Sequence, residues 1–191
     1  MRRQSVISCA TTLLLLTFLL SSCSLFKPSF NGGVIDPPWP APEIKLPDHN
    51  GNTFQLSALR GKIVLIFFGY TNCPDECPAT MAHLKLALDA VGDNAKDVQV
   101  VMITTDPVRD TPQALKDFLA HFSPTFLGIP GTQEQLEKVW KDYGVTVLDG
   151  GETHSSFTYV VDRHGDIRET FNPDTTSDEM ASDLKILLKE K

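Results

Sequence analysis

The chain has 191 residues, with 24 acidic and 17 basic side chains and a formal net charge of −7. This acidic balance argues against a nucleic-acid-binding protein, because contacts with phosphate require a basic surface. The length fits one domain after a short leader.

The first 22 residues predict a signal peptide. Arg2 and Arg3 form a basic region, and residues 10–20 form a mostly Leu stretch that is too short to cross a bilayer as a helix. Leu20-Ser21-Ser22-Cys23 resembles the bacterial lipoprotein box, in which the Cys is acylated and becomes the new N-terminus. We therefore expect a lipid anchor on Cys23, since acyl chains contribute roughly 0.8 kcal/mol per buried methylene. The alternative is an ordinary signal peptide followed by an unmodified Cys.

Cleavage before Cys23 removes both arginines and leaves 169 residues with a net charge of −9. Residues 23–42 are then the lipidated Cys and a flexible, Pro-rich tether, and residues 43–191 are the folded domain. Such a protein lies in the bacterial cell envelope, anchored to a membrane and facing the periplasm or extracytoplasmic space.

The domain begins with a turn and a buried strand. Asp48-His49-Asn50-Gly51 is typical of a hairpin turn. Residues 63–68 are a continuous apolar run of β-formers, as expected for a strand that is buried on both faces. Apolar side chains recur at helical spacing over residues 79–91, and we expect Pro78 at the first position of this helix.

Strand and helix patterns continue to alternate toward the C-terminus. Residues 98–104 predict a second buried strand. The elements expected after it are a helix from Thr111-Pro112 to 121 or 122, a helix over about 132–143, a hairpin of 157–162 and 167–171, and a helix over 177–189 with Ser177 or Asp178 as N-cap. This order predicts an α/β fold of three layers, in which helices cover both faces of a central mixed sheet.

Cys73 and Cys77 are the two cysteines that the domain contains. They lie between a strand end and a helix start, where the partial positive charge of the helix favours thiolate. A spacing of four residues places both sulfurs on one face if the first turn is helical. This pattern predicts metal binding or redox chemistry. A structural disulfide is the alternative, but so short a loop gives little stabilisation.

Tyr70-Thr71-Asn72-Cys73-Pro74-Asp75-Glu76-Cys77-Pro78 resembles the motif of the Sco/SenC family of cytochrome oxidase assembly proteins. The similarity covers most of the chain from about Trp39. Further segments resemble the family in the same order, namely 106–112, 126–128, 131–132 and His154 before the terminal hairpin. The resemblance implies a thioredoxin-like fold and a copper site whose ligands are Cys73, Cys77 and His154.

These ligand types suit copper, because soft thiolates select Cu(I) and an added imidazole also serves Cu(II). Zinc accepts the same ligand types. Asp106 could be an outer ligand or a hydrogen-bond partner of a ligand, and an ion-pair and capping network with Arg109 and Asp110 is an equally good account. The remaining side chains are expected to be solvated histidines and one core methionine: His49, His83, His121, His164 and Met81.

Two functions remain open. The favoured one is an extracytoplasmic metallochaperone that delivers copper to the dinuclear copper centre of cytochrome c oxidase during assembly. Its partners would be the copper-centre subunit of the oxidase and other periplasmic copper chaperones, and it would be a carrier and not an enzyme. The alternative is a thiol–disulfide oxidoreductase that uses Cys73 and Cys77 to keep the copper-ligand cysteines of the oxidase reduced.

Two departures from the thioredoxin pattern favour the metal site. Thioredoxin-type enzymes place two residues between the cysteines and a cis-Pro beside them. This chain has three residues between Cys73 and Cys77, and Ser156 lies near the position of the Pro. Peroxide reduction is the least favoured function, since no Arg and Thr motif precedes Cys73.

Overall fold

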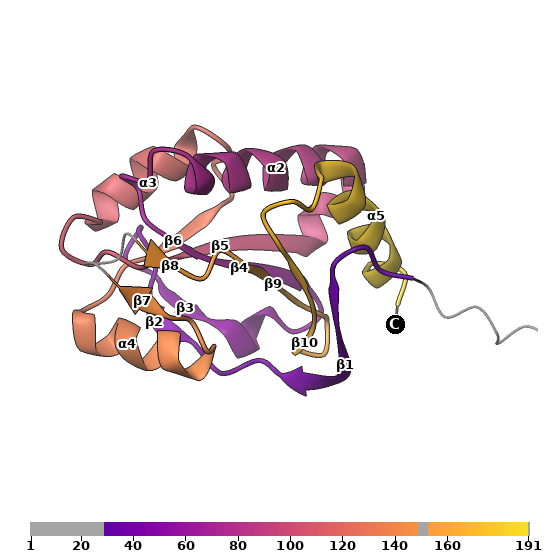
Figure 1. Cartoon of the computed structure of the whole chain (residues 1–191), viewed down its shortest axis with the longest axis horizontal. Helices are drawn as coiled ribbons and strands as arrows, with labels where there is room; N and C mark the ends of the chain where they lie inside the picture. The colour runs from indigo at the N-terminus through magenta and orange to yellow at the C-terminus, as the bar shows by residue number, and fades with distance from the viewer. Residues whose placement is uncertain (1–28, 149–152, 191) are drawn as a thin grey trace, which may run out of the picture.

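The computed structural model describes residues 29–148 and 153–190. Its centre is a six-stranded mixed sheet with the strand order β1-β10-β9-β4-β5-β6 (Figure 1). The strands are β1 (Gly33–Pro40), β4 (Ile63–Gly69), β5 (Val98–Thr104), β6 (Leu127–Ile129), β9 (Thr158–Val161) and β10 (Asp166–Phe171). β4, β5 and β6 run parallel to one another, whereas β9, β10 and β1 are added in antiparallel fashion. The predicted α/β fold with a mixed sheet is confirmed.

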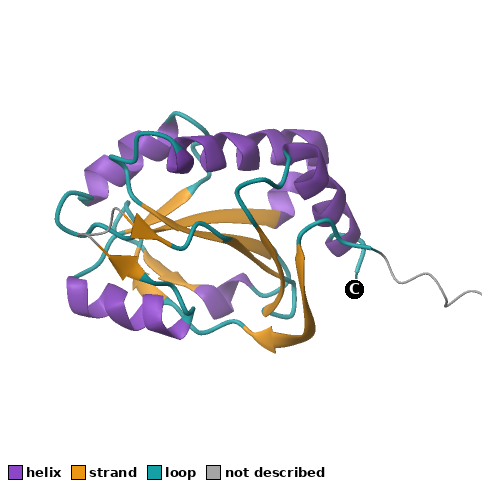
Figure 2. Ribbon diagram, in the orientation of Figure 1, coloured by secondary structure: helices purple, strands orange, loops and turns teal. Residues whose placement is uncertain are grey.

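Helices cover both faces of this sheet (Figure 2). α2 (Glu76–Val91), α3 (Pro112–Ala120) and α5 (Ser177–Leu187) lie on one side, and α4 (Gln133–Asp142) lies on the other. The short elements of residues 29–148 and 153–190 are the hairpin of β2 (Lys45–Pro47) with β3 (Thr53–Gln55), the hairpin of β7 (Val147–Leu148) with β8 (Thr153–His154), and the 3-10 helices η2 (Leu56–Leu59) and η3 (Gly92–Asp97). In the described residues, no helix has the length and apolarity to cross a membrane.

Alternate side chains of β4 build two separate cores. Leu65 and Phe67 are among the residues that face α2, α3 and α5. Ile66 and Phe68 face α4 and the β2–β3 hairpin on the other side of the sheet. All four are completely buried, which explains why the strand has no polar positions: successive side chains point to opposite faces and both faces are covered.

Three boundaries differ from the expectations. Residues 33–40, expected in the tether, form the edge strand β1, because the outer edge of β10 has backbone groups that need partners. α2 starts at Glu76, so Pro78 occupies the third helical position. Proline is tolerated there because the first four N–H groups of a helix have no partner within it. Thr176 is the N-cap of α5.

Candidate metal site

The two cysteines of the motif lie beside the carboxyl ends of the central parallel strands. Gly69 ends β4 and is paired in register with Thr104, which ends β5. The chain then passes through a loop that contains Cys73 and enters α2, whose second residue is Cys77. Parallel strands bring their carboxyl ends to one edge of the sheet, which is where α/β proteins place their sites.

Cys77 is buried, and its sulfur lies against the backbone of β4. A Cβ atom added to Gly69 would lie 2.9 Å from the Cys77 Sγ and would collide with the ring of Phe67. Gly69 therefore has a packing reason to be glycine: the sulfur occupies the space that a side chain would need. Burial raises the pKa of the Cys77 thiol far above its ordinary value, and the neighbouring Cys73 raises it further.

Cys73 is half-buried, and its sulfur accepts a hydrogen bond from the backbone N–H of Cys77 at 3.4 Å. Burial raises the pKa of Cys73, but hydrogen bonds from the N–H groups of Cys77 and Asp75, from the Cys77 thiol and from Tyr70 outweigh it and lower the pKa below its ordinary value. The two cysteines are not joined by a disulfide. The pair is thus asymmetric, because Cys73 is the accessible sulfur that ionises first and Cys77 is the buried one.

His154 belongs to the short β7–β8 hairpin, and its backbone pairs with that of Val147. The described part of the structure does not include its side chain. Two residues later, the Ser156 hydroxyl donates a hydrogen bond of 2.7 Å to the Glu76 carboxylate, which adjoins Cys77. The segment that follows His154 is therefore attached to the start of α2, at the residue before Cys77.

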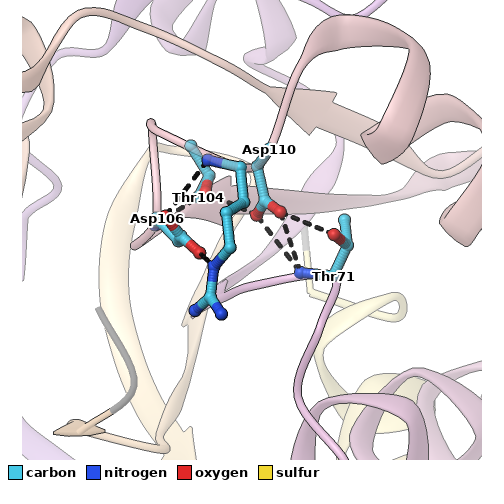
Figure 3. A network of polar contacts seen from close by, with 5 residues as sticks. Thr71, Thr104, Asp106 and Asp110 are labelled. Atoms are coloured by element: carbon cyan, nitrogen blue, oxygen red, sulfur yellow. Dashed lines mark hydrogen bonds and ion pairs between the residues drawn. The ribbon is translucent and has the colours of Figure 1, made fainter. Parts of the chain in front are cut away.

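Asp106 follows β5 and is almost completely buried. Its Oδ1 accepts from the Arg109 N–H at 3.2 Å, and its Oδ2 forms an ion pair with the Arg109 Nε (Figure 3). The Arg109 guanidinium lies 5.7 Å from the centre of the Tyr70 ring. Of the two accounts of Asp106, this geometry favours the ion pair that closes the turn between β5 and α3.

Asp110 has a role that the sequence did not suggest. The capping network predicted for this turn ends at Thr111, which is the N-cap of α3 and whose side chain accepts from the Ala114 N–H. Asp110 instead accepts hydrogen bonds from Thr71 and Thr104 (Figure 3). A signal for this contact was present, since acids that follow one buried parallel strand lie next to the loop that follows its neighbour.

His49 is not simply solvated, contrary to our expectation. It is half-buried, and its ring Nδ1 accepts a hydrogen bond from the Gly128 N–H at 3.0 Å. The backbone N–H of His49 donates to the Gly128 carbonyl at 2.8 Å. Burial lowers the pKa of His49, in keeping with a neutral ring that accepts a hydrogen bond. It therefore fixes the β2–β3 hairpin to β6. Met81 is a fully buried core residue, as expected.

The described residues contain no group of three or more His, Cys, Asp or Glu side chains arranged to hold a metal ion. The two sulfurs are nevertheless adjacent, as soft ligands of one ion must be. The expected third ligand depends on the His154 side chain, and the expected lipidation site, Cys23, lies outside the described residues.

Comparison with known proteins finds relatives over most of the chain. Residues 41–189 match the model of the SCO1/SenC family. The SCO2-like protein of Rickettsia conorii is 36% identical over 152 residues, which cover 75% of this chain and 74% of that protein. The structure of Bradyrhizobium japonicum ScoI with copper bound has a TM-score of 0.71 and 36% identity, and the match covers 77% of this chain and 98% of that chain. The solution structure of apo Sco1 from Thermus thermophilus has a TM-score of 0.74 and 32% identity, with 83% and 97% of the two chains covered.

Proposed function

Because this chain belongs to the SCO1/SenC family, we propose that it binds one copper ion through Cys73, Cys77 and His154 and delivers it to cytochrome c oxidase during assembly. The observation that carries the proposal is the pair of adjacent thiols at the start of α2, with the Cys73 sulfur 3.4 Å from the Cys77 N–H. The copper-bound structure of the Bradyrhizobium ScoI, with its thioredoxin-like fold, supports the choice of metal.

The asymmetry of the two sulfurs suits an ion that must be both held and released. Cys77 fixes one ligand inside the domain, while Cys73 is half-exposed and is followed by exposed Asp75 and Glu76. Ligands of a receiving protein could reach the metal from the Cys73 side and replace the sulfurs one at a time. The segment of His154, attached through Ser156 to Glu76, would supply the third ligand and complete the coordination sphere.

Copper titration of the reduced, full-length protein in detergent under anaerobic conditions tests this proposal. We expect one copper per chain by metal analysis. Oxidation of Cys73 and Cys77 to a disulfide removes both thiolate ligands, so copper uptake should collapse. Equally tight copper binding by the oxidised protein would show that these sulfurs are not the ligands.

The second candidate function is reduction of disulfides in the copper-binding site of the oxidase. The observation that favours it is the same asymmetry, because an accessible thiol with a lowered pKa beside a buried partner is also the arrangement of a dithiol reductant. Thiol exchange needs Cys73 and Cys77 but no imidazole. The two functions therefore differ in their need for His154.

Complementation of a deletion strain with His154→Ala and with Cys73→Ser separates these functions. Copper delivery predicts that both variants lose oxidase activity at limiting copper, although His154→Ala retains disulfide exchange. Normal oxidase activity with His154→Ala, together with loss for Cys73→Ser, would favour the reductase. Added copper serves as the control, since it should rescue a weakened copper site more readily than a lost thiol.

We also propose that the mature protein is attached to a membrane by a lipid on Cys23 and faces the extracytoplasmic space. The support is the sequence Leu20-Ser21-Ser22-Cys23. Cys23→Ala should move the protein from the membrane fraction to the soluble envelope fraction. Membrane association that survives this substitution would argue against the anchor.

A further inference from the structure

The loop between β4 and α2 is held by a buried carboxylate that is not among the proposed copper ligands. Asp110 lies between β5 and α3 and is 2% exposed. Its Oδ1 accepts a hydrogen bond from the Thr71 hydroxyl at 2.6 Å, and its Oδ2 accepts one from the Thr104 hydroxyl at 2.6 Å. The Thr71 N–H lies 3.2 Å from each of the two oxygens (Figure 3). We call this arrangement the Asp110 clamp.

The clamp is built on rigid elements. The Asp110 N–H donates to the Asp106 carbonyl at 2.9 Å, and the next residue, Thr111, caps α3. Thr104 is the last residue of β5. The backbone of Asp110 is therefore held by the turn before it and by the capped helix after it. Its side chain in turn holds Thr71, which lies two residues before Cys73.

The backbone and sulfur hydrogen bonds of Cys73 in this loop are longer. The Cys73 N–H donates to the Tyr70 carbonyl at 3.4 Å, and the Cys73 sulfur accepts from the Cys77 N–H at 3.4 Å. The N–H···O bond of Cys73 is weak at this length, compared with the 2.6 Å contacts of the clamp, whereas 3.4 Å is an ordinary distance for a sulfur acceptor. Thr71 is thus a point at which short hydrogen bonds join the loop before Cys73 to the end of β5 and the start of α3.

The clamp contains a charged group, although burying a neutral group would cost less free energy. Burial raises the pKa of Asp110, which reflects the cost of keeping a carboxylate out of water. An Asn has the same shape but only one oxygen, so it cannot accept from the hydroxyls of both Thr71 and Thr104 in this geometry. The carboxylate is the group that satisfies both hydroxyls.

We propose that Asp110 is a positioning residue for the cysteine site, which clamps Thr71 to the end of β5 and thereby holds the Cys73 sulfur at the start of α2. Its effect on copper binding rests on the proposed function, whereas its effect on the cysteine pair does not. Loosening the clamp should lower the effective concentration of one thiol with respect to the other. Both disulfide formation and binding of one ion by two sulfurs should then become less favourable.

The experiment compares Asp110→Asn with a matched variant at the other end of the domain. Asp183 in α5 is also completely buried and accepts three hydrogen bonds from another segment: from the Asn31 N–H at 2.8 Å, from the Asn31 side chain at 2.7 Å and from the Gly32 N–H at 3.0 Å. Asp183→Asn removes one acceptor oxygen from a buried carboxylate, as Asp110→Asn does, without touching the cysteine loop.

Two quantities are measured on the metal-free, full-length protein. The first is the thiol–disulfide equilibrium of Cys73 and Cys77 in a glutathione buffer, quantified by mass spectrometry of the tryptic peptide that carries both cysteines. The second is the Cu(I) affinity, measured by competition with a chelator. For Asp110→Asn we expect a shift of about tenfold toward the dithiol and a loss of at least about tenfold in Cu(I) affinity. For Asp183→Asn we expect changes below about twofold in both.

A disulfide equilibrium of Asp110→Asn within twofold of the wild type, or an equal shift in Asp183→Asn, would overturn the proposal. If the wild type binds no Cu(I), the proposed function fails but the disulfide equilibrium still decides the role of Asp110. Should Asp110→Asn not fold, Thr71→Val removes one hydroxyl from the clamp and should shift the equilibrium in the same direction. Thr71→Ser restores the hydroxyl and should return it to the wild-type value, which a purely structural defect of the loop would not do.

Discussion

Buried aspartates hold a remote segment at each end of the domain, and their surroundings differ in one respect. Asp110 at the cysteine end receives hydroxyl donors on both oxygens. Asp183 at the opposite end is equally well supplied by Asn31 and Gly32, but it has a second acid, Glu169, beside it. The cysteine end thus holds a carboxylate whose donors are all present, while the far end holds two neighbouring acids, of which Glu169 has a pKa raised to about 9.

Glu169 is completely buried, and no donor among the described residues reaches either of its oxygens. Burial, and then the Asp183 carboxylate, raise the pKa of Glu169 to about 9, although Arg168 acts in the opposite direction. The hydrogen bond that can join Glu169 to Asp183 requires a proton, so it exists only when Glu169 is neutral. The comparison shows that a buried acid is kept either by donors, as at Asp110, or by a proton, as at Glu169.

A glycine permits the close approach at each end. A Cβ on Gly69 would lie 2.9 Å from the Cys77 sulfur, and a Cβ on Gly32 would lie 2.7 Å from the Glu169 Oε2. In both cases a neighbouring backbone or ring also blocks the space, so a small movement of one flexible group cannot make room. The largest expected effects follow from filling these spaces.

Gly69→Ala should lower the free energy of unfolding by about 3 kcal/mol, because the new methyl collides with Phe67 and Cys77 in a tightly packed core. Denaturant unfolding followed by circular dichroism measures the loss. Gly32→Ala should destabilise the protein comparably, but only Gly69→Ala should displace Cys77 and shift the thiol–disulfide equilibrium. An equal shift in both variants would show that the two ends are not independent.

Glu169→Gln has a smaller expected effect and the opposite sign. The amide needs no proton and can donate to Asp183, so the variant should be more stable than the wild type by about 1–2 kcal/mol at pH 8. The sign follows from linkage: the folded pKa of about 9 exceeds the ordinary value of 4.5, so the folded state binds the proton more tightly. The contribution of Glu169 is fully present below about pH 4.5 and is lost as the pH rises through about 9.

Urea unfolding at pH 5, 7 and 9 checks this prediction. The difference between Glu169→Gln and the wild type should grow as the pH rises from 5 to 9. A constant difference across this range would mean that Glu169 does not titrate in it. Asp110→Asn serves as a contrast, since its removal of an acceptor should destabilise the protein throughout this range.

The smallest expected effects come from the helix caps of the two ends. Thr111 caps α3 beside the cysteines, and Thr176 caps α5 at the far end. Replacement of either by Ala should cost about 1 kcal/mol. If the Asp110 clamp positions the loop, Thr111→Ala should leave the thiol–disulfide equilibrium within about twofold of the wild type, as Thr176→Ala should. A large shift in Thr111→Ala would move the positioning role from Asp110 to the start of α3.

The sequence predicted the elements whose pattern is set by burial. β4 and β5 were recognisable because both of their faces are covered, which leaves a continuous apolar run. β1 was not, because its prolines are typical of a tether and its pairing depends on the distant strand β10. β7 and β8 have two residues each, too few for a period to be recognised.

The residues of the site likewise fall into those that the sequence predicted and those that it did not. Cys73 and Cys77 could be found from the motif and from their place between a strand and a helix. The bonds of Asp110 to Thr71 and of Ser156 to Glu76 span 39 and 80 residues of sequence, respectively. The end of β5 indicates the neighbourhood of Asp110, but no local pattern indicates which side chain in that neighbourhood it will meet.

The early start of the sheet has a consequence for how far the domain can travel. If Cys23 carries the lipid, the tether ends where Asp183 accepts a hydrogen bond from Asn31, and not at residue 42, the last residue before the expected start of the folded domain. Eight residues of fully extended chain reach at most about 28 Å, compared with about 70 Å for the longer tether. This tether joins the domain beside α5, at the opposite end from β7 and β8 (Figure 1). The height above the bilayer at which the cysteines can meet a partner would then depend on how far the domain tilts about this short tether, more than on how far the tether lets it move from the membrane.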